Sequence, residues 1–189
     1  RDAILRSAYS LMRRYGFAKT TVDEIAREAG VAKGTIYLHF DSKEDILIAL
    51  VAETNRRALE KMEKIAASRL SPAKKLEKML LARVMHIFEV VHSNPHGEEM
   101  IVSHKPAIVE SLDWFFRDQA KLYERVIREG KQQGVFAEKT PREAARLLGN
   151  LSELLTPPYY RLTARSEVES FARGMARRFI RGISKNDSR

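Results

Sequence analysis

The sequence predicts an all-α protein of about nine helices, arranged as a small N-terminal three-helix head and a larger C-terminal helical body. Apolar residues recur at three- and four-residue spacing along most of the 189 residues, and no segment alternates apolar and polar residues as a strand would. Helix starts are repeatedly marked by capping residues and by proline. We expect the head to span residues 1–47 and the body residues 48–189, with one helix at about 43–68 joining them.

The head begins with a helix at residues 2–15. A second helix follows Thr21, which forms a capping box with Glu24 three residues later. Gly30 then supplies the left-handed backbone that commonly ends a helix. A third helix is expected at 33–40.

The third helix buries Ile36 and Phe40, which are one turn apart. Its outward or edge-facing candidates are Lys33, Thr35, Tyr37 and His39. Two short helices joined by a glycine turn, the second of them bearing polar and basic residues, describe a helix-turn-helix. This motif predicts a protein that binds DNA.

The helix that joins head and body starts at a second capping box, formed by Ser42 and Asp45. It continues without a helix-breaking residue to about residue 68. A helix of about 25 residues is about 37 Å long, so this one can connect two bodies and transmit movement between them.

The body contains the remaining predicted helices. Three of their starts carry a capping signal: Ser71-Pro72, Thr140-Pro141 and the capping box of Ser166 and Glu169. The predicted ranges are about 72–91, 98–103, 106–133, 141–156 and 166–183.

Composition excludes several classes of protein. Hydrophobic residues make up 44% of the chain, which is enough for a sizeable core, and charged residues make up 31%. The chain has no cysteine, so disulfides, thiol catalysis and cysteine-ligated zinc are excluded. No apolar run approaches the ~18 residues of a membrane span, and no secretory signal leads the chain. We expect a cytoplasmic protein with no membrane partner and no cofactor.

The net charge of +9 suits a nucleic-acid partner, but the basic residues are not concentrated in the head. Residues 1–50 hold 8 Lys and Arg against 7 Asp and Glu, whereas residues 161–189 hold 8 against 3. The argument for DNA binding therefore rests on the motif and not on overall charge.

The stretch VAKGTIYLHFDSKEDIL resembles the signature of the TetR/AcrR family of bacterial transcriptional regulators. The resemblance covers about Ile4 to Leu50 and is strongest at Gly-Thr-Ile-Tyr-x-x-Phe followed by Ser-Lys-Glu, whereas the body matches only in helix count and order. It implies a DNA-binding head, a body that binds a small apolar or amphipathic effector, and repression that the effector relieves. It also implies a homodimer formed mainly by the helices at about 141–156 and 166–183.

Carried over by position, the family pattern assigns DNA contacts to seven residues of the head. They are Lys33, Gly34, Thr35, Tyr37 and His39 on the recognition helix, with Thr21 and Lys43 as phosphate contacts at helix N-termini. Helix N-termini offer free N–H groups to phosphate. Gly34 permits close approach, and Tyr37 can offer its hydroxyl to phosphate or its ring to a thymine methyl. The alternative is that Tyr37 and His39 are ordinary surface residues.

The candidate effector contacts in the body are Arg83, His86, Phe115, Gln119 and Tyr123. Arg83 and His86 interrupt a nearly all-apolar helix, and Gln119 lies on an apolar stripe, so each would need a polar partner when buried. If Arg83 lines a pocket, the effector is anionic and apolar, such as a fatty-acyl compound. The alternative is that Arg83 pairs with a carboxylate, His86 is a core histidine and Gln119 caps a loop, with the aromatic residues in the core.

Two other functions remain open. A metal-dependent enzyme would need the cluster of His92, His96, Glu98, Glu99 and His104, but Pro95 and Gly97 place part of it in a loop, where histidines are mostly solvated. The body could also dock a protein instead of a small molecule. The mechanism that we expect is different. A dimer places two recognition helices about 34–36 Å apart on a palindromic operator, and the effector changes that separation.

Overall fold

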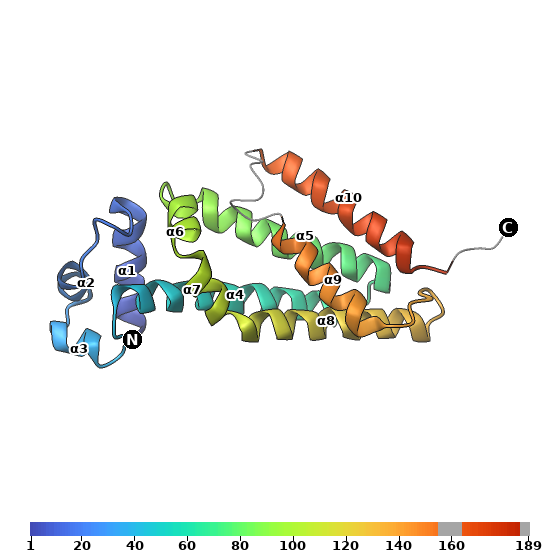
Figure 1. Cartoon of the computed structure of the whole chain (residues 1–189), viewed down its shortest axis with the longest axis horizontal. Coiled ribbons are helices and arrows are strands. Elements are labelled where there is room, and N and C mark those ends of the chain that lie inside the picture. Colours follow the sequence, from blue (N-terminus) through green and yellow to red (C-terminus); the bar gives the residue numbers. More distant parts are fainter. Residues whose placement is uncertain (155–163, 186–189) are drawn as a thin grey trace. The chain divides into compact units, whose positions relative to one another are not determined.

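The computed structural model describes residues 1–154 and 164–185, and within them every regular element is a helix (Figure 1). The prediction of an all-α fold is confirmed. The helices are α1 (Asp2–Tyr15), α2 (Val22–Ala29), α3 (Lys33–Tyr37), α4 (Lys43–Ala66), α5 (Pro72–His92), α6 (Gly97–Ser103), α7 (Lys105–Ser111), α8 (Asp113–Gln132), α9 (Pro141–Glu153) and α10 (Arg165–Ile183). No helix in this part of the chain is long and apolar enough to cross a membrane.

The long helix predicted at about 106–133 is two helices, because the chain turns at Leu112. The Ser111 hydroxyl donates to the Ile108 carbonyl at 2.8 Å and so competes for an acceptor of the helix ladder. The Leu112 backbone N–H then donates to the Val109 carbonyl at 3.2 Å, which closes a tighter turn. This turn separates α7 from α8 and raises the count above the predicted nine.

Two predicted N-caps do not cap their helices. Helix α10 begins before Ser166, follows Ala164 and has no side-chain cap. Thr140 precedes α9 as predicted, but its hydroxyl donates to the Glu138 carboxylate at 3.1 Å and does not cap the helix. The predicted end of α9 near residue 156 lies outside the described residues.

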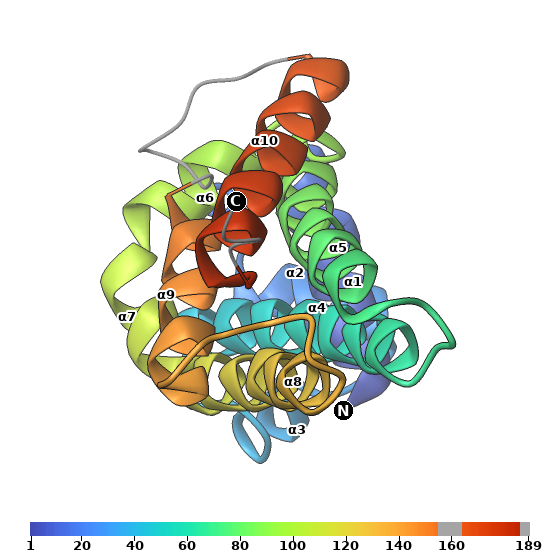
Figure 2. The same cartoon turned by 90° about the vertical axis from the view of Figure 1, so that its right-hand side faces the viewer.

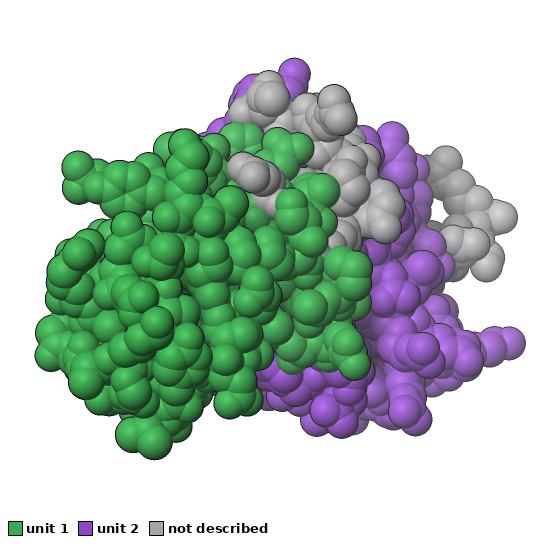
Figure 3. Space-filling model, turned by 60° about the vertical axis from the view of Figure 1, so that its left-hand side comes forward, with its two compact units in different colours: residues 1–55, 90–112 green, residues 56–89, 113–189 purple. Residues whose placement is uncertain are grey.

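The chain forms two compact units, which Figure 3 distinguishes by colour. Unit 1 contains residues 1–55 and 90–112, and unit 2 contains residues 56–89 and 113–189. Helices α4 and α5 each run without interruption from one unit into the other. The segment 90–112 belongs to unit 1 with the head helices, although its place in the sequence predicts the body.

Unit 1 has its own core, formed where the helices of the head meet. Ile4, Met12, Ile25 and Ile46 are each at most 1% exposed and belong to one cluster. Met100 of α6 is buried in the same cluster, so α6 is part of this unit's packing. This core holds the two helices of the helix-turn-helix against α1 and the start of α4.

Unit 2 packs α5, α8, α9 and α10 around a larger core (Figure 2). Its fully buried members include Met79, Leu80, Tyr123, Val126 and Leu148. Helices α8 and α9 have the most extensive contact of any helix pair in the described chain. The predicted effector contacts lie within this unit.

Candidate DNA interface and effector site

Helix α2 is fixed at both ends by the contacts that its sequence predicts. Thr21 Oγ1 accepts from the Glu24 backbone N–H at 3.2 Å, and the Glu24 carboxylate accepts from the Thr21 backbone N–H at 2.8 Å. The Thr21 hydroxyl also donates to this carboxylate at 2.8 Å, and this bond, together with the one from the backbone N–H, lowers the pKa of Glu24. At the other end of α2, Gly30 adopts a left-handed backbone with φ 66° and ψ 33°. Both ends of α2 are therefore defined.

Helix α3 presents most of its surface to solvent. Its buried side is formed by Ile36 and Phe40, which are 1% and 6% exposed. The helix is shorter than predicted, but the Phe40 backbone N–H still donates to the Ile36 carbonyl at 3.0 Å. Of the predicted DNA-contacting residues on this helix and its end, Lys33, Gly34, Tyr37 and His39 are exposed and Thr35 is partly buried.

The sequence-based set misses one residue of this surface, Leu38. Its side chain is 81% exposed, the largest fraction among the large hydrophobic residues of the described chain. A signal was present, because Leu38 is two residues from both Ile36 and Phe40 and must therefore lie on the opposite side of the helix. Its neighbours Tyr37 and His39 have polar groups that suit DNA contact, whereas a leucine is usually predicted to lie in the core.

Lys33 forms an exposed ion pair with Asp23 of α2. The Lys33 Nζ lies 3.0 Å from an Asp23 carboxylate oxygen, and the two side chains are 52% and 67% exposed. The bond to Asp23 raises the pKa of Lys33. Exposed pairs contribute little stability, so Lys33 can exchange Asp23 for a DNA phosphate at small cost.

The Lys43 side chain is used within the head. Its Nζ donates to the carbonyls of Phe17 at 2.8 Å and Thr20 at 2.7 Å, and it lies 4.3 Å from the centroid of the Phe17 ring. In this structure the ammonium holds the α1–α2 loop against the start of α4. Thr21 is also engaged, because its hydroxyl both donates to and accepts from Glu24. Both residues keep their places beside a helix N-terminus.

The segment that includes α6 packs directly on the α1–α2 loop. The rings of His104 and Phe17 meet edge to face with centroids 4.3 Å apart. Gly16 lies so close to His96 that a Cβ at position 16 would be 3.3 Å from that ring. Gly16 also has φ 85°, a left-handed value that favours glycine. The loop behind α2 is thus held from two sides, by Lys43 and by this segment.

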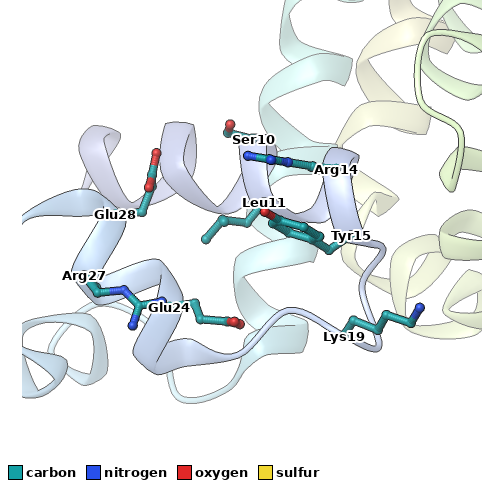
Figure 4. A pocket seen from close by; sticks show the side chains of 8 residues that line it. All are labelled: Ser10, Leu11, Arg14, Tyr15, Lys19, Glu24, Arg27 and Glu28. Carbon is teal, nitrogen blue, oxygen red and sulfur yellow. The ribbon is translucent and has the colours of Figure 1, made fainter.

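A shallow cavity of about 290 Å³ lies between α1 and α2 (Figure 4). Figure 4 shows Leu11 and Tyr15 lying between the two helices. The charged residues that line it carry both signs: Arg14, Lys19 and Arg27 against Glu24 and Glu28. This mixture does not select one class of ligand, and we assign no site to it.

The residues predicted to contact an effector all lie in unit 2, on α5 and α8. Arg83 is 3% exposed, and its Nη2 donates to Glu153 Oε1 of α9 at 2.8 Å. Its guanidinium carbon lies 4.4 Å from the centroid of the buried Phe115 ring. Of the two interpretations of Arg83, the structure shows pairing with a carboxylate. The positive charge of Arg83 is therefore already balanced.

Two buried polar atoms on α8 have no hydrogen-bond partner among residues 1–154 and 164–185. They are Gln119 Nε2 and Tyr123 Oη, from residues one turn apart on the same face of the helix. Burial raises the pKa of Tyr123, so its hydroxyl keeps its proton and remains a donor. Leaving such a donor unsatisfied costs about 1–3 kcal/mol. Gln119 therefore does not cap a loop; it lies in the core with unused hydrogen-bonding capacity.

His86 lies on α5 three residues after Arg83 and is partly buried. Burial, reinforced by the positive charge of Arg83, lowers the pKa of His86 to about 4. The imidazole is therefore neutral at pH 7. This agrees with a core histidine and leaves the ring able to accept or donate one hydrogen bond.

Comparison with known proteins places the fold and the motif in one family. Residues 4–50 match the model of the bacterial regulatory proteins of the tetR family. The chain is 27% identical over 168 residues to the fatty acid metabolism regulator protein of Bacillus subtilis, covering 81% of this chain and 80% of that protein. A TetR/AcrR regulator from Thermobifida fusca shares the fold with a TM-score of 0.73 and 24% identity, covering 98% of this chain and 96% of the other.

Residues 4–50 are a DNA-binding domain of the tetR family.

A third similarity is to the structure of the regulator FadR from Bacillus subtilis, which was solved in complex with stearoyl-CoA. Its TM-score is 0.67 at 23% identity, covering 96% of this chain and 98% of that chain. TetR-family proteins are DNA-binding transcriptional regulators and are not enzymes, which settles the class of function. No group of three His, Asp or Glu side chains able to hold a metal ion occurs among the described residues.

Proposed function

We propose that this TetR-family chain is a repressor that binds a palindromic operator as a homodimer and leaves it when an effector binds the body. The observation that carries the DNA-binding part is the exposed surface of α3, which is anchored by Ile36 and Phe40 and bounded by a rigid capped turn. We place the DNA-binding domain at residues 1–47 and the effector-binding and dimerisation domain at 48–189. The predicted setting is the cytoplasm, where DNA is accessible.

The proposed DNA contacts divide into two kinds. Lys33, Gly34, Thr35, Tyr37 and His39 face the major groove, because they occupy the unburied surface of α3 and its C-terminal end. Thr21 and Lys43 contribute through their positions beside the N-termini of α2 and α4, where backbone N–H groups and the helix dipole favour phosphate. Their side chains hold the loop in place.

The dimer is proposed to form through α9 and α10. Leu147 and Leu154 are seven residues apart, lie on one side of α9 and are each 54% exposed. Phe171 of α10 is 46% exposed. A pair of helices with unburied large apolar side chains fits a two-fold four-helix interface in which each copy covers the other's apolar surface. Replacing Leu147 and Leu154 with Glu should give a monomer in sedimentation velocity.

The effector site is proposed to lie at Arg83, His86, Phe115, Gln119 and Tyr123. Gln119 Nε2 and Tyr123 Oη are buried donors beside aromatic and aliphatic side chains. An apolar molecule that carries a hydrogen-bond acceptor would remove the cost of leaving these donors unsatisfied. Gly149 of α9 lets Gln119 pack closely against that helix, because a Cβ there would be 3.0 Å from Gln119 Oε1.

The charge balance refines the expected chemistry of the effector. Because Glu153 already neutralises Arg83, a buried carboxylate would add an uncompensated negative charge. A neutral acceptor, such as the carbonyl of an acyl thioester, would not. The similarity to a fatty acid metabolism regulator and to a FadR structure with stearoyl-CoA supports an acyl thioester over a free fatty acid.

The proposed link between effector and DNA is α4, which is continuous from Lys43 to Ala66 and belongs to both units. An effector that binds one position of α4 more tightly than another shifts the population of states and thereby the spacing of the two recognition helices. The segment around α6 is a second proposed link between the effector site and the head. It continues the chain directly from α5, and it packs on the α1–α2 loop.

The test of this function is selection of binding sites from a randomised DNA duplex library, followed by footprinting. We expect enrichment of an inverted repeat whose half-sites are one helical turn, or a multiple of it, apart. The monomeric double variant of Leu147 and Leu154 should protect at most one half-site. Recovery of no preferred sequence, or of a single asymmetric site, would refute the proposal.

A further inference from the structure

The surface of α3 is organised in rows of residues four apart. At about 100° per residue, the buried row of Ile36 and Phe40 lies opposite the row of Gly34 and Leu38, which is displaced by about 200°. Leu38 follows the last residue of α3 but keeps right-handed helical backbone, with φ −70° and ψ −16°. Its backbone N–H donates to the Gly34 carbonyl at 3.1 Å, so the row is continuous. The row lies at the centre of the exposed surface.

The two members of this row differ in what they present to solvent. At Gly34 an added Cβ would have nothing within 4 Å, so the surface there is bare and open and is not covered by the Leu38 side chain. Leu38 is therefore an exposed apolar side chain next to an open position, with Tyr37 on one side of its row and His39 on the other.

An apolar side chain that is 81% exposed at the centre of a DNA-facing surface calls for an apolar partner. Among the groups that base pairs present in the major groove, the only one that is apolar is the C5 methyl of thymine. We propose that Leu38 is a specificity-determining residue that contacts a thymine methyl in each operator half-site. This inference rests on the proposed DNA-binding function and adds a residue and a base to it.

The contact explains why Gly34 precedes Leu38 by one turn. A side chain at position 34 would hold the helix away from the base edges, whereas glycine lets the Leu38 methyl groups reach van der Waals distance of the groove floor. Burying one methyl in such a contact is worth about 0.8 kcal/mol, which corresponds to roughly a fourfold change in affinity per contact. Polar neighbours supply the remaining base and phosphate contacts.

The experiment uses the full chain and the duplex selected by the wild-type protein from a randomised library. Each thymine of a half-site is replaced in turn by uracil, which removes only the C5 methyl, and the symmetric position is replaced with it. Affinity is measured by fluorescence anisotropy. One symmetric pair of uracils removes two such contacts and should weaken wild-type binding by about fifteenfold, and uracil elsewhere should have little effect.

Variants at position 38 test whether the sensitivity to uracil depends on the Leu38 side chain. Leu38→Ala should bind the unmodified duplex more weakly and should no longer distinguish thymine from uracil at the sensitive position. Leu38→Met should keep part of the discrimination, because it restores an apolar side chain. Val109→Ala, which shortens another exposed apolar residue of unit 1, is the matched control and should discriminate as the wild type does.

The outcomes separate this inference from the function on which it rests. Unchanged thymine-to-uracil discrimination in Leu38→Ala overturns the role of Leu38, while DNA binding by the family fold stands. The absence of any uracil-sensitive position in the wild type overturns it as well. If the wild type selects no sequence at all, the proposed repressor function fails together with this inference.

Discussion

The ammonium of Lys43 lies 2.8 Å from the carbonyl oxygen of Phe17 and 4.3 Å from the centroid of the same residue's ring. One side chain at the start of α4 therefore holds both the backbone and the aromatic ring of the α1–α2 loop. Because α4 belongs to both units, this contact joins the proposed transmission helix to the loop behind the recognition helices.

Replacing Lys43 with Met should lower the free energy of unfolding by about 1.5–3 kcal/mol, because hydrogen bonds from a charged group to two carbonyls are lost. Lys33→Met is the matched control, and its loss of stability should be much smaller because its ion pair is exposed. Urea denaturation followed by circular dichroism gives both values. Equal stability of the two variants would show that Lys43 is not a structural link.

Tyr37 is 48% exposed and contributes nothing to the head core, so its removal should affect DNA binding and not folding. We expect Tyr37→Ala to weaken operator binding about tenfold or more while leaving the unfolding transition within about 0.5 kcal/mol of wild type. Tyr37→Phe removes the hydroxyl and keeps the ring, so it distinguishes the contributions of the two groups to DNA affinity. If gel-shift affinity is the same in all three proteins, the assignment of this face is wrong.

The pair of Arg83 and Glu153 should behave as a buried ion pair. Glu153→Gln leaves the Arg83 charge buried without its carboxylate, which should cost about 3 kcal/mol of stability. The double variant Arg83→Met with Glu153→Leu should recover most of that loss, because no charge remains buried. Chemical denaturation of the wild type and the two variants compares these losses. A double variant that is no more stable than Glu153→Gln would contradict the prediction.

His86 should make stability depend on pH. Its folded pKa of about 4 lies below the ordinary value of 6.5, so between these values the unfolded chain binds the proton more readily. The stability is therefore fully present above pH 6.5 and is lost as the pH falls toward 4. Between pH 7 and pH 5 the wild type should lose about 1–2 kcal/mol more than His86→Gln. Parallel losses in the two proteins would contradict this origin.

Much of the head could be predicted from sequence because its signals are local. The Thr21–Glu24 capping box, the left-handed Gly30 and the burial of Ile36 and Phe40 all follow from residues close together in the chain. Leu38 is not marked by polarity, although the helical period that buries Ile36 also exposes Leu38. Leu38 is identified by the exposure of its side chain and not by its chemical type alone.

The contacts that could not be predicted join residues far apart in sequence. Nothing near Lys43 indicates that its ammonium reaches back to Phe17, and nothing near Arg83 indicates Glu153 as its partner. Tertiary placement decides both of these cases. The turn at Leu112 is different because it is local: the Ser111 hydroxyl bonds to the Ile108 carbonyl three residues before it, but the apolar period continues on both sides and conceals the break in the sequence.

The measurement that most directly tests the central claim is operator affinity with and without stearoyl-CoA, in the wild type and in Gln119→Leu. Stearic acid is the comparison ligand. We predict that saturating stearoyl-CoA weakens operator binding by the wild type about tenfold or more, corresponding to a coupling of about 1–3 kcal/mol. Gln119→Leu should respond less, and stearic acid should have little effect. Binding of stearoyl-CoA with no change in operator affinity would contradict the account.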